Sequence, residues 1–167
     1  NYFLLYLSLL LLFGFFFLYE KHIIGNDSTI SEWMINYQGG FTKRGVIGEI
    51  CFQIAQFFNI KLRFIIFLFQ SIIYSVYIIM IFQYLKNIKI NYLILFVIFS
   101  PIFILYPVAE IEVLARKELF IFIGFLLFLN FSLSKYDVDV SLSYNFIALP
   151  ILTLIWEPII FFFPFFL

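Results

Sequence analysis

Charged residues are scarce in this sequence, and cysteine and histidine each occur once. Charged residues make up 12% of the 167 residues, against about a quarter in a soluble domain, whereas 65% are hydrophobic. A water-soluble core of this size could not hide so much apolar surface. Cys51 and His22 stand alone, which excludes an internal disulfide, a cysteine-rich zinc site and a histidine-cluster metal site within the sequence. The sequence identifies no cofactor, and a bound divalent cation would need oxygen ligands.

An excess of either charge is also missing. Ten Lys and Arg residues balance ten Asp and Glu residues, so the basic surplus typical of nucleic-acid binding is absent. We therefore expect membrane lipid, and no nucleic acid, as a partner.

Apolar runs dominate instead, and several approach the roughly 20 residues that cross a bilayer as a helix. They predict an all-α fold, a multi-pass transmembrane helical bundle that forms a single transmembrane domain over 1–167. Pro101 and Pro107 are expected to kink or shorten the third span, and Pro150, Pro158 and Pro164 to break the last. The chain begins without methionine and stops inside an apolar run, so we expect a fragment of a longer polypeptide. The predicted spans are 2–19, 62–85, 91–109, 119–133 and 144–167.

The segment 45–60 predicts an amphipathic helix. On a helical wheel its polar residues and glycines fall within an arc of about 140° and the remaining positions are apolar. Such a helix suits the membrane interface, and also a span whose polar stripe faces a protein interior. Its sixteen residues are short for a span, which favours the interface. The residues of the polar arc are Gly45, Gly48, Glu49, Gln53, Gln56 and Asn59.

The polar loop after the first span carries the clearest candidate site. Gly39 and Gly40 allow a tight turn and a close backbone approach to a ligand. Lys43 and Arg44 precede the predicted helix, whose free N–H groups and dipole favour an anion, and Arg adds a bidentate fork. A phosphate or pyrophosphate at the membrane surface fits this arrangement. The alternative is that the two bases only anchor the helix to lipid headgroups.

Two acids of the same loop are candidates for general base or metal ligand. Asp27 and Glu32 lie close behind the first span, near the membrane surface. Their spacing of five residues is no metal-binding signature, so solvated loop acids remain the alternative. Asp27 also suits a plain helix cap.

A second charged cluster lies before the fourth span. Glu112 and Arg116 stand four apart in the order that favours pairing if the segment is helical. Arg116 and Lys117 begin the span, where they could bind a second anionic group. The alternative is a pair of flanking bases that extend to the interface.

Glu157 is the one acid inside the last apolar run. A carboxylate in hydrocarbon is costly, so such an intramembrane acid is a functional candidate. The alternative is that Pro158 breaks the run and brings Glu157 to an interface or a re-entrant bend.

The basic residues leave the orientation open. If 45–60 does not cross, seven bases stand on one side, and the positive-inside rule predicts that this side is cytoplasmic. If the adjacent bases at 43–44 and 116–117 bind a ligand instead, three bases remain on each side. The sparser side holds Lys86, Lys89 and Lys135.

The loop acid followed by a juxtamembrane amphipathic helix resembles the N-terminal part of GT-C-type glycosyltransferases, which use polyprenyl-phosphate-linked sugars. The stretches 36–45 and 115–118 are also similar to uncharacterised membrane proteins of bacterial surface-polysaccharide gene clusters. The resemblance implies a multi-pass protein of the bacterial inner membrane that acts in polysaccharide biosynthesis. It further implies that Asp27 or Glu32 is the catalytic base or a metal ligand, although the loop 20–44 itself has no Asp-x-Asp or Glu-x-Asp pair.

Three functional hypotheses follow. The first is a membrane glycosyltransferase or polysaccharide polymerase in which Lys43, Arg44 and Arg116 hold a lipid-linked phosphate and Glu157 faces the cavity. The second is a transporter or flippase with Glu157 in a midplane site of a proline-broken helix. The third is a non-catalytic membrane subunit whose charges only set topology.

Overall fold

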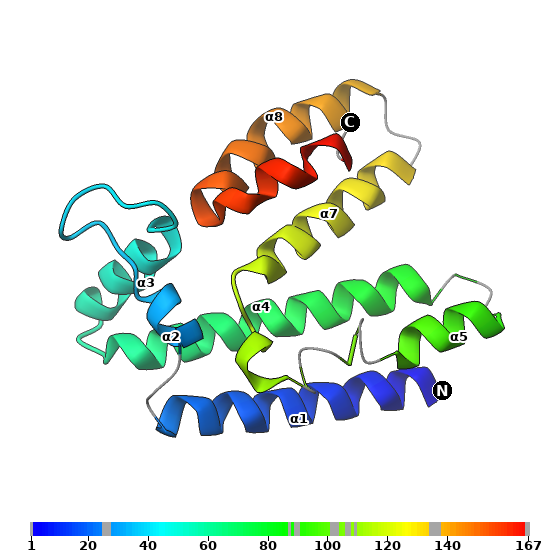
Figure 1. Cartoon of the computed structure of the whole chain (residues 1–167), viewed down its shortest axis with the longest axis horizontal. Helices are drawn as coiled ribbons and strands as arrows, with labels where there is room; N and C mark the ends of the chain where they lie inside the picture. The colour runs from blue at the N-terminus through cyan, green and yellow to red at the C-terminus, as the bar shows by residue number, and fades with distance from the viewer. Residues whose placement is uncertain are drawn as a thin grey trace.

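The computed structural model describes residues 2–24, 28–86, 88, 91–100, 104–105, 108, 110–133 and 138–165. Every regular element in these ranges is a helix, in agreement with the all-α prediction (Figure 1). The elements, in chain order, are α1 (Tyr2–Ile24), α2 (Ser28–Trp33), α3 (Val46–Phe57), α4 (Leu62–Leu85), α5 (Tyr92–Phe99), η1 (Ile111–Val113), α7 (Glu118–Leu133), α8 (Val138–Ile155) and η2 (Glu157–Phe165).

Two of the described helices, α1 and α4, are long and apolar enough to cross a membrane. Their 23 and 24 residues correspond to about 35 Å, more than the roughly 30 Å of a bilayer's hydrocarbon core. Large apolar side chains such as Leu12, Phe16 and Ile72 remain more than half exposed on them. This is the surface expected of helices in contact with lipid. Further crossings, and hence the multi-pass bundle, remain a prediction.

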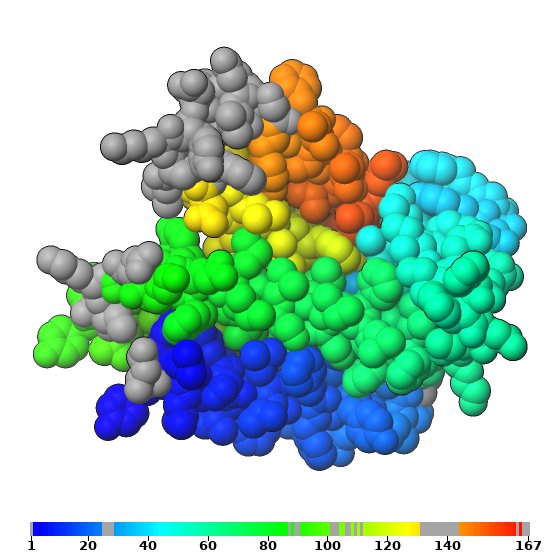
Figure 2. Space-filling model, turned by 180° about the vertical axis from the view of Figure 1, so that it is seen from behind, coloured from blue at the N-terminus to red at the C-terminus, as the bar shows by residue number. Residues whose placement is uncertain are grey.

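The helices pack in the order α1, α4, α7, α8 (Figure 1). The antiparallel helices α1 and α4 lie side by side, and α7 and α8 form a second antiparallel pair above them, with η2 returning along α8. Gly14 allows the close α1–α4 contact, because a Cβ there would clash with the ring of the buried Tyr74. The opposite face shows α7 between α4 and α8 (Figure 2).

The predicted spans agree with the helices where no proline intervenes. The span 62–85 coincides with α4, the span 119–133 differs from α7 by one residue, and α1 continues five residues beyond the predicted 2–19. Among the described residues of the predicted span 91–109, the longest helix is the eight-residue α5, which ends at Phe99 because Ser100, the residue before Pro101, is extended at φ −65° and ψ 137°. The predicted shortening of the third span is thus confirmed before Pro101. Pro107 lies outside the described residues.

The last predicted span, 144–167, is two elements. The helix α8 begins earlier, at Val138, and ends at Ile155, and η2 follows from Glu157. Pro158 has no N–H for an α-helical bond and its ring crowds an earlier carbonyl, which favours an end of the α-helix before it. Pro150 was expected to break the run too, which is wrong, because α8 runs through it. Pro164 lies inside η2.

The helix α3 occupies most of the predicted 45–60 segment. Its buried residues are Ile47, Gly48, Cys51 and Ala55, and it packs on α4 and α8. Gly48 was assigned to the polar stripe, but it faces the protein, where a Cβ would clash with the Ile35 carbonyl oxygen. Gln53 and Gln56 are exposed. Twelve residues, about 18 Å, are too short to span a bilayer.

Candidate functional site: a charged cluster

Several element ends meet at one end of the molecule: the last turn of α1, all of α2 and α3, the start of α4 and α7, and the end of α8 (Figure 1). Five charged side chains from three separate chain segments gather there. We call this group the charged cluster: Glu32, Lys43, Arg44, Lys117 and Glu157.

Arg44 is the centre of the charged cluster. Its Nη1 donates to Oε1 of Glu32 at 3.2 Å and its Nη2 donates to Oε1 of Glu157 at 3.1 Å. The guanidinium fork therefore joins the end of α2 to the start of η2. The Glu32 side chain is 15% exposed and that of Glu157 is 36% exposed. Glu157 is thus the partner that solvent or a ligand reaches more easily.

Lys43 extends the cluster toward solvent. Its Nζ lies 3.5 Å from Oε2 of Glu157, and its side chain is 80% exposed. An ion pair so exposed contributes little to stability. The hydrogen bond from Arg44 is the main reason that the pKa of Glu157 lies below its ordinary value, and the nearby Lys43 charge acts in the same direction.

Lys117 lies beneath Arg44 and is fully buried. Its Nζ donates to the Arg44 carbonyl oxygen at 2.6 Å. Burial lowers the pKa of Lys117 to about 8, against the opposing effect of the Glu32 carboxylate. Burial also raises the pKa of the Cys51 thiol to about 11, so this cysteine is protonated at neutral pH.

Two residues beside this hydrogen bond have left-handed backbone conformations. Arg44 has φ 65° and Ala115 has φ 56°, a region that residues other than glycine rarely occupy. Such conformations persist only where the surrounding structure enforces them. The bond from Lys117 to the Arg44 carbonyl is one such constraint, and it fixes the direction in which the Arg44 side chain leaves the backbone.

The loop before α3 is held by Glu49. Its carboxylate accepts from the Tyr37 N–H at 3.0 Å, from Gln38 Nε2 at 2.9 Å and from Gln53 Nε2 at 2.6 Å. These hydrogen bonds, with that from Gln53 contributing most, lower the pKa of Glu49. The first turn of α3 thereby fixes the loop that carries Lys43 and Arg44.

The glycine pair forms the predicted tight turn. Gly40 donates its N–H to the Tyr37 carbonyl at 3.0 Å and has φ 113°, which requires glycine. Gly39 and Gly40 are exposed, and no contact with the charged cluster is found for them among the described residues. Their role in phosphate binding stays a prediction.

Arg116 does not pair as expected. Its Nη2 lies 3.2 Å from Oε1 of Glu118, not beside Glu112. The expected pair needs a continuous helix, but η1 covers only Ile111–Val113 and the left-handed Ala115 redirects the chain. The predicted Glu112–Arg116 pair is therefore wrong. The neighbouring Lys117, predicted with Arg116, is the residue that reaches Arg44.

Sequence reasoning missed a polar network that supports the cluster. Lys21 donates to Thr29 Oγ1 at 3.2 Å and to the Glu112 carbonyl at 3.3 Å, joining α1, α2 and η1. Gln70, fully buried in α4, lies 2.7 Å from His22 Nε2 and donates to the Ala115 carbonyl at 3.2 Å. A glutamine inside the apolar run 62–85 was the available signal.

Asp27, the other candidate acid, lies outside the described residues. Among the described His, Cys, Asp and Glu side chains, no group of three or more is placed to hold a metal ion. Comparison of the chain with protein-family models, curated proteins and solved structures finds no match.

Proposed function

We propose that this chain belongs to an integral membrane glycosyltransferase or polysaccharide polymerase that acts on a polyprenyl-phosphate-linked sugar, with the charged cluster as its phosphate site. The observation that carries the proposal is the Arg44 fork between Glu32 and Glu157, with Lys43 and Lys117 beside it. Cations that can bind a phosphate and carboxylates that can accept a proton thus lie within one site at the end of membrane-length helices.

Phosphate would enter by competing with Glu157. The cluster holds three cations and two carboxylates, and the more exposed carboxylate is the one shared by Lys43 and Arg44. A phosphate oxygen takes the Nη2–H and Nζ–H donors from Glu157, while Glu32 keeps Arg44 oriented through Nη1. The exchange frees Glu157 beside the bound phosphate.

The transfer step is then a displacement at the sugar's anomeric carbon. The acceptor hydroxyl forms a bond to this carbon as the bond to the phosphate oxygen breaks, and the lipid phosphate leaves with the electron pair. The hydroxyl proton passes to a carboxylate, and we assign this role to Glu157 or Glu32, which both pair with Arg44. Arg44 and Lys43 stabilise the charge that develops on the leaving phosphate.

The test measures sugar transfer from a polyprenyl-phosphate-linked donor in membrane vesicles. Arg44→Lys keeps the charge but loses the planar fork, so transfer should fall by about 10- to 100-fold. Glu157→Gln and Glu32→Gln each remove one candidate base, and the variant that removes the actual base should lower the rate by about 100-fold or more. The exposed acid Glu20 of α1 gives the matched control, Glu20→Gln, which should retain activity. Wild-type transfer by all three cluster variants would refute the proposal.

One observation favours a second function, a transporter or flippase. Glu157 lies at the junction where α8 ends and η2 begins, and discontinuous helices form ion and substrate sites in secondary transporters. This function predicts proton-coupled uptake that is lost in Glu157→Gln, in vesicles that make no glycosyl product.

A further inference from the structure

A groove with one polar end lies between α4 and α7, away from the charged cluster. Its apolar part has a volume of about 220 Å³ and is lined by Tyr77, Ile81, Leu85, Phe125, Leu126 and Leu129, among others. The rings of Tyr77 and Phe122 approach to 6.1 Å at one end of the lining. Its lining residues follow the C-terminal parts of α4 and α7.

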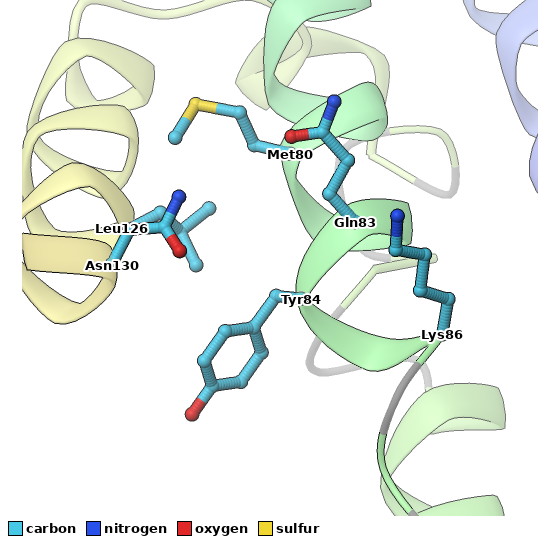
Figure 3. A pocket seen from close by; sticks show the side chains of 6 residues that line it. All are labelled: Met80, Gln83, Tyr84, Lys86, Leu126 and Asn130. Carbon is cyan, nitrogen blue, oxygen red and sulfur yellow. The ribbon is translucent and has the colours of Figure 1, made fainter. Parts of the chain in front are cut away.

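Polar side chains line a second hollow that shares Tyr84 and Leu126 with the apolar part. This hollow, which we call the mouth of the groove, has a volume of about 210 Å³. Its other lining residues include Gln83 of α4, Lys86 directly after α4, and Asn130 of α7. In Figure 3, Met80 and Tyr84 extend from α4 toward Leu126 and Asn130, whereas Gln83 and Lys86 lie on the side of α4 farther from α7. Lys86 is exposed, and no ion pair joins its ammonium to any of the carboxylates whose side chains the structure describes. The groove therefore changes from apolar to cationic along its length.

The dimensions correspond to one lipid leaflet. From Tyr77 to Lys86 the groove follows α4 for nine residues, about 14 Å, and half of a bilayer's hydrocarbon core is about 15 Å. Lys86 caps α4 directly after its apolar run, at the level where lipid headgroups lie.

We propose that this groove binds an anionic phospholipid, with an acyl chain between α4 and α7 and the headgroup phosphate at Lys86. The amides of Gln83 and Asn130 supply further donors to the headgroup, and Lys86 supplies the charge complementarity. Because α4 is long enough to cross the membrane, the bound lipid belongs to the leaflet opposite the charged cluster. The groove is thus a second lipid site, independent of sugar transfer.

The test uses the full chain in detergent, titrated with phosphatidylglycerol or with phosphatidylcholine of the same acyl chains, with binding read by native mass spectrometry. Wild-type protein should prefer phosphatidylglycerol. Lys86→Gln should weaken phosphatidylglycerol binding about fivefold and leave phosphatidylcholine binding unchanged. The matched control Lys61→Gln removes an exposed lysine at the other end of α4 and should change neither.

Filling the groove tests the acyl-chain position. Leu126→Trp should abolish binding of both lipids while the thermal transition is retained, and Leu129→Trp provides a second variant if Leu126→Trp fails to fold. Equal binding of both lipids by wild-type protein, or loss in Lys61→Gln as in Lys86→Gln, would overturn the headgroup assignment. A dimer that dissociates in Leu126→Trp would show that a second copy of the chain, rather than lipid, fills the groove.

Discussion

Lys117 combines full burial with a hydrogen bond to the backbone of Arg44. Its ammonium is desolvated, and burial brings its pKa to about 8 from an ordinary 10.5. In the unfolded chain the same group keeps its ordinary pKa. Between these two values the unfolded state therefore binds more protons than the folded state, so stability rises with pH across this window and the cost of the buried cation is fully present below it.

We predict that the melting temperature of the wild-type protein rises between about pH 8 and pH 10.5 relative to that of Lys117→Met, by on the order of a few degrees. Methionine has a similar length and no charge, so the variant lacks this proton linkage. Thermal melts of both proteins in detergent, at intervals across the window, measure the difference. A difference that is constant with pH would mean that the Lys117 ammonium is not destabilised by burial.

The sequence identified members of the charged cluster one at a time. Glu32, Arg44 and Glu157 each stood out by local pattern, but Arg44 is 12 residues from one partner and 113 from the other. No local rule pairs residues so far apart, because the pairing depends on how α8 returns to the loop. The prediction of the Glu112–Arg116 pair used a local rule, and it failed because the left-handed Ala115 interrupts the helix that the rule assumes. Nothing in the sequence marks Ala115 as left-handed.

At the scale of single elements, α3 depends on one close backbone approach. Gly48 faces the end of α2, where a Cβ would clash with the Ile35 carbonyl oxygen and lie 2.7 Å from that of Trp33. Carbonyl oxygens cannot move aside as a flexible side chain can. The packing of α3 against this turn therefore positions the loop that carries Lys43 and Arg44.

Gly48→Ala should destabilise the protein by about 1–3 kcal/mol, more than the helix propensity of alanine recovers. The matched control is Gly39→Ala, since a Cβ at this exposed position meets nothing within 4 Å, and its effect should stay within about 0.5 kcal/mol. Denaturant titration in mixed micelles measures both variants. Equal stability of the two would contradict the close packing of α3.

Helix positions followed from the sequence wherever apolar runs were uninterrupted. The bounds of α4 agree with the predicted 62–85 at both ends. Proline decided the remaining cases, and its effect depends on tertiary context: α8 continues through Pro150, whereas α5 stops before Pro101. Amphipathic pattern alone did not show which face of α3 is covered, because Gly48 is small enough to suit either environment.

At the scale of the whole molecule, the two ends of α4 differ in the basic residues that surround them. Lys21, Arg63 and Lys117 are connected through hydrogen bonds to backbone carbonyls at the charged-cluster end, and Lys86 lies at the other end. The positive-inside rule assigns the cluster end to the cytoplasm, unless these bases serve a ligand. A glycosyltransferase of the GT-C type requires the charged cluster on the external side. A measurement of the orientation therefore discriminates between the cytoplasmic side that the rule assigns and the external side that this function requires.

Cysteine labelling in intact cells measures this orientation. Cys51 is fully buried, and Cys51→Ser gives a background into which Gly39→Cys or Lys86→Cys is introduced. If α4 crosses the membrane, an impermeant maleimide should label one of the two variants and spare the other. The proposed function expects the label on Gly39→Cys. Labelling of both from the same side would exclude a crossing by α4.

The sequence separation within the charged cluster also matters while the protein is being made. Glu157 leaves the ribosome 113 residues after Arg44, an interval of about 6–20 s at ordinary rates of synthesis. Throughout that interval the nascent chain already contains Lys43 and Arg44, with Glu32 available to Arg44, but lacks Glu157, the acid that both bases share. Anionic headgroups around the translocation machinery are the available substitutes, so we expect the growing chain to be held at the membrane surface by contacts that the finished hairpin of α8 and η2 later replaces.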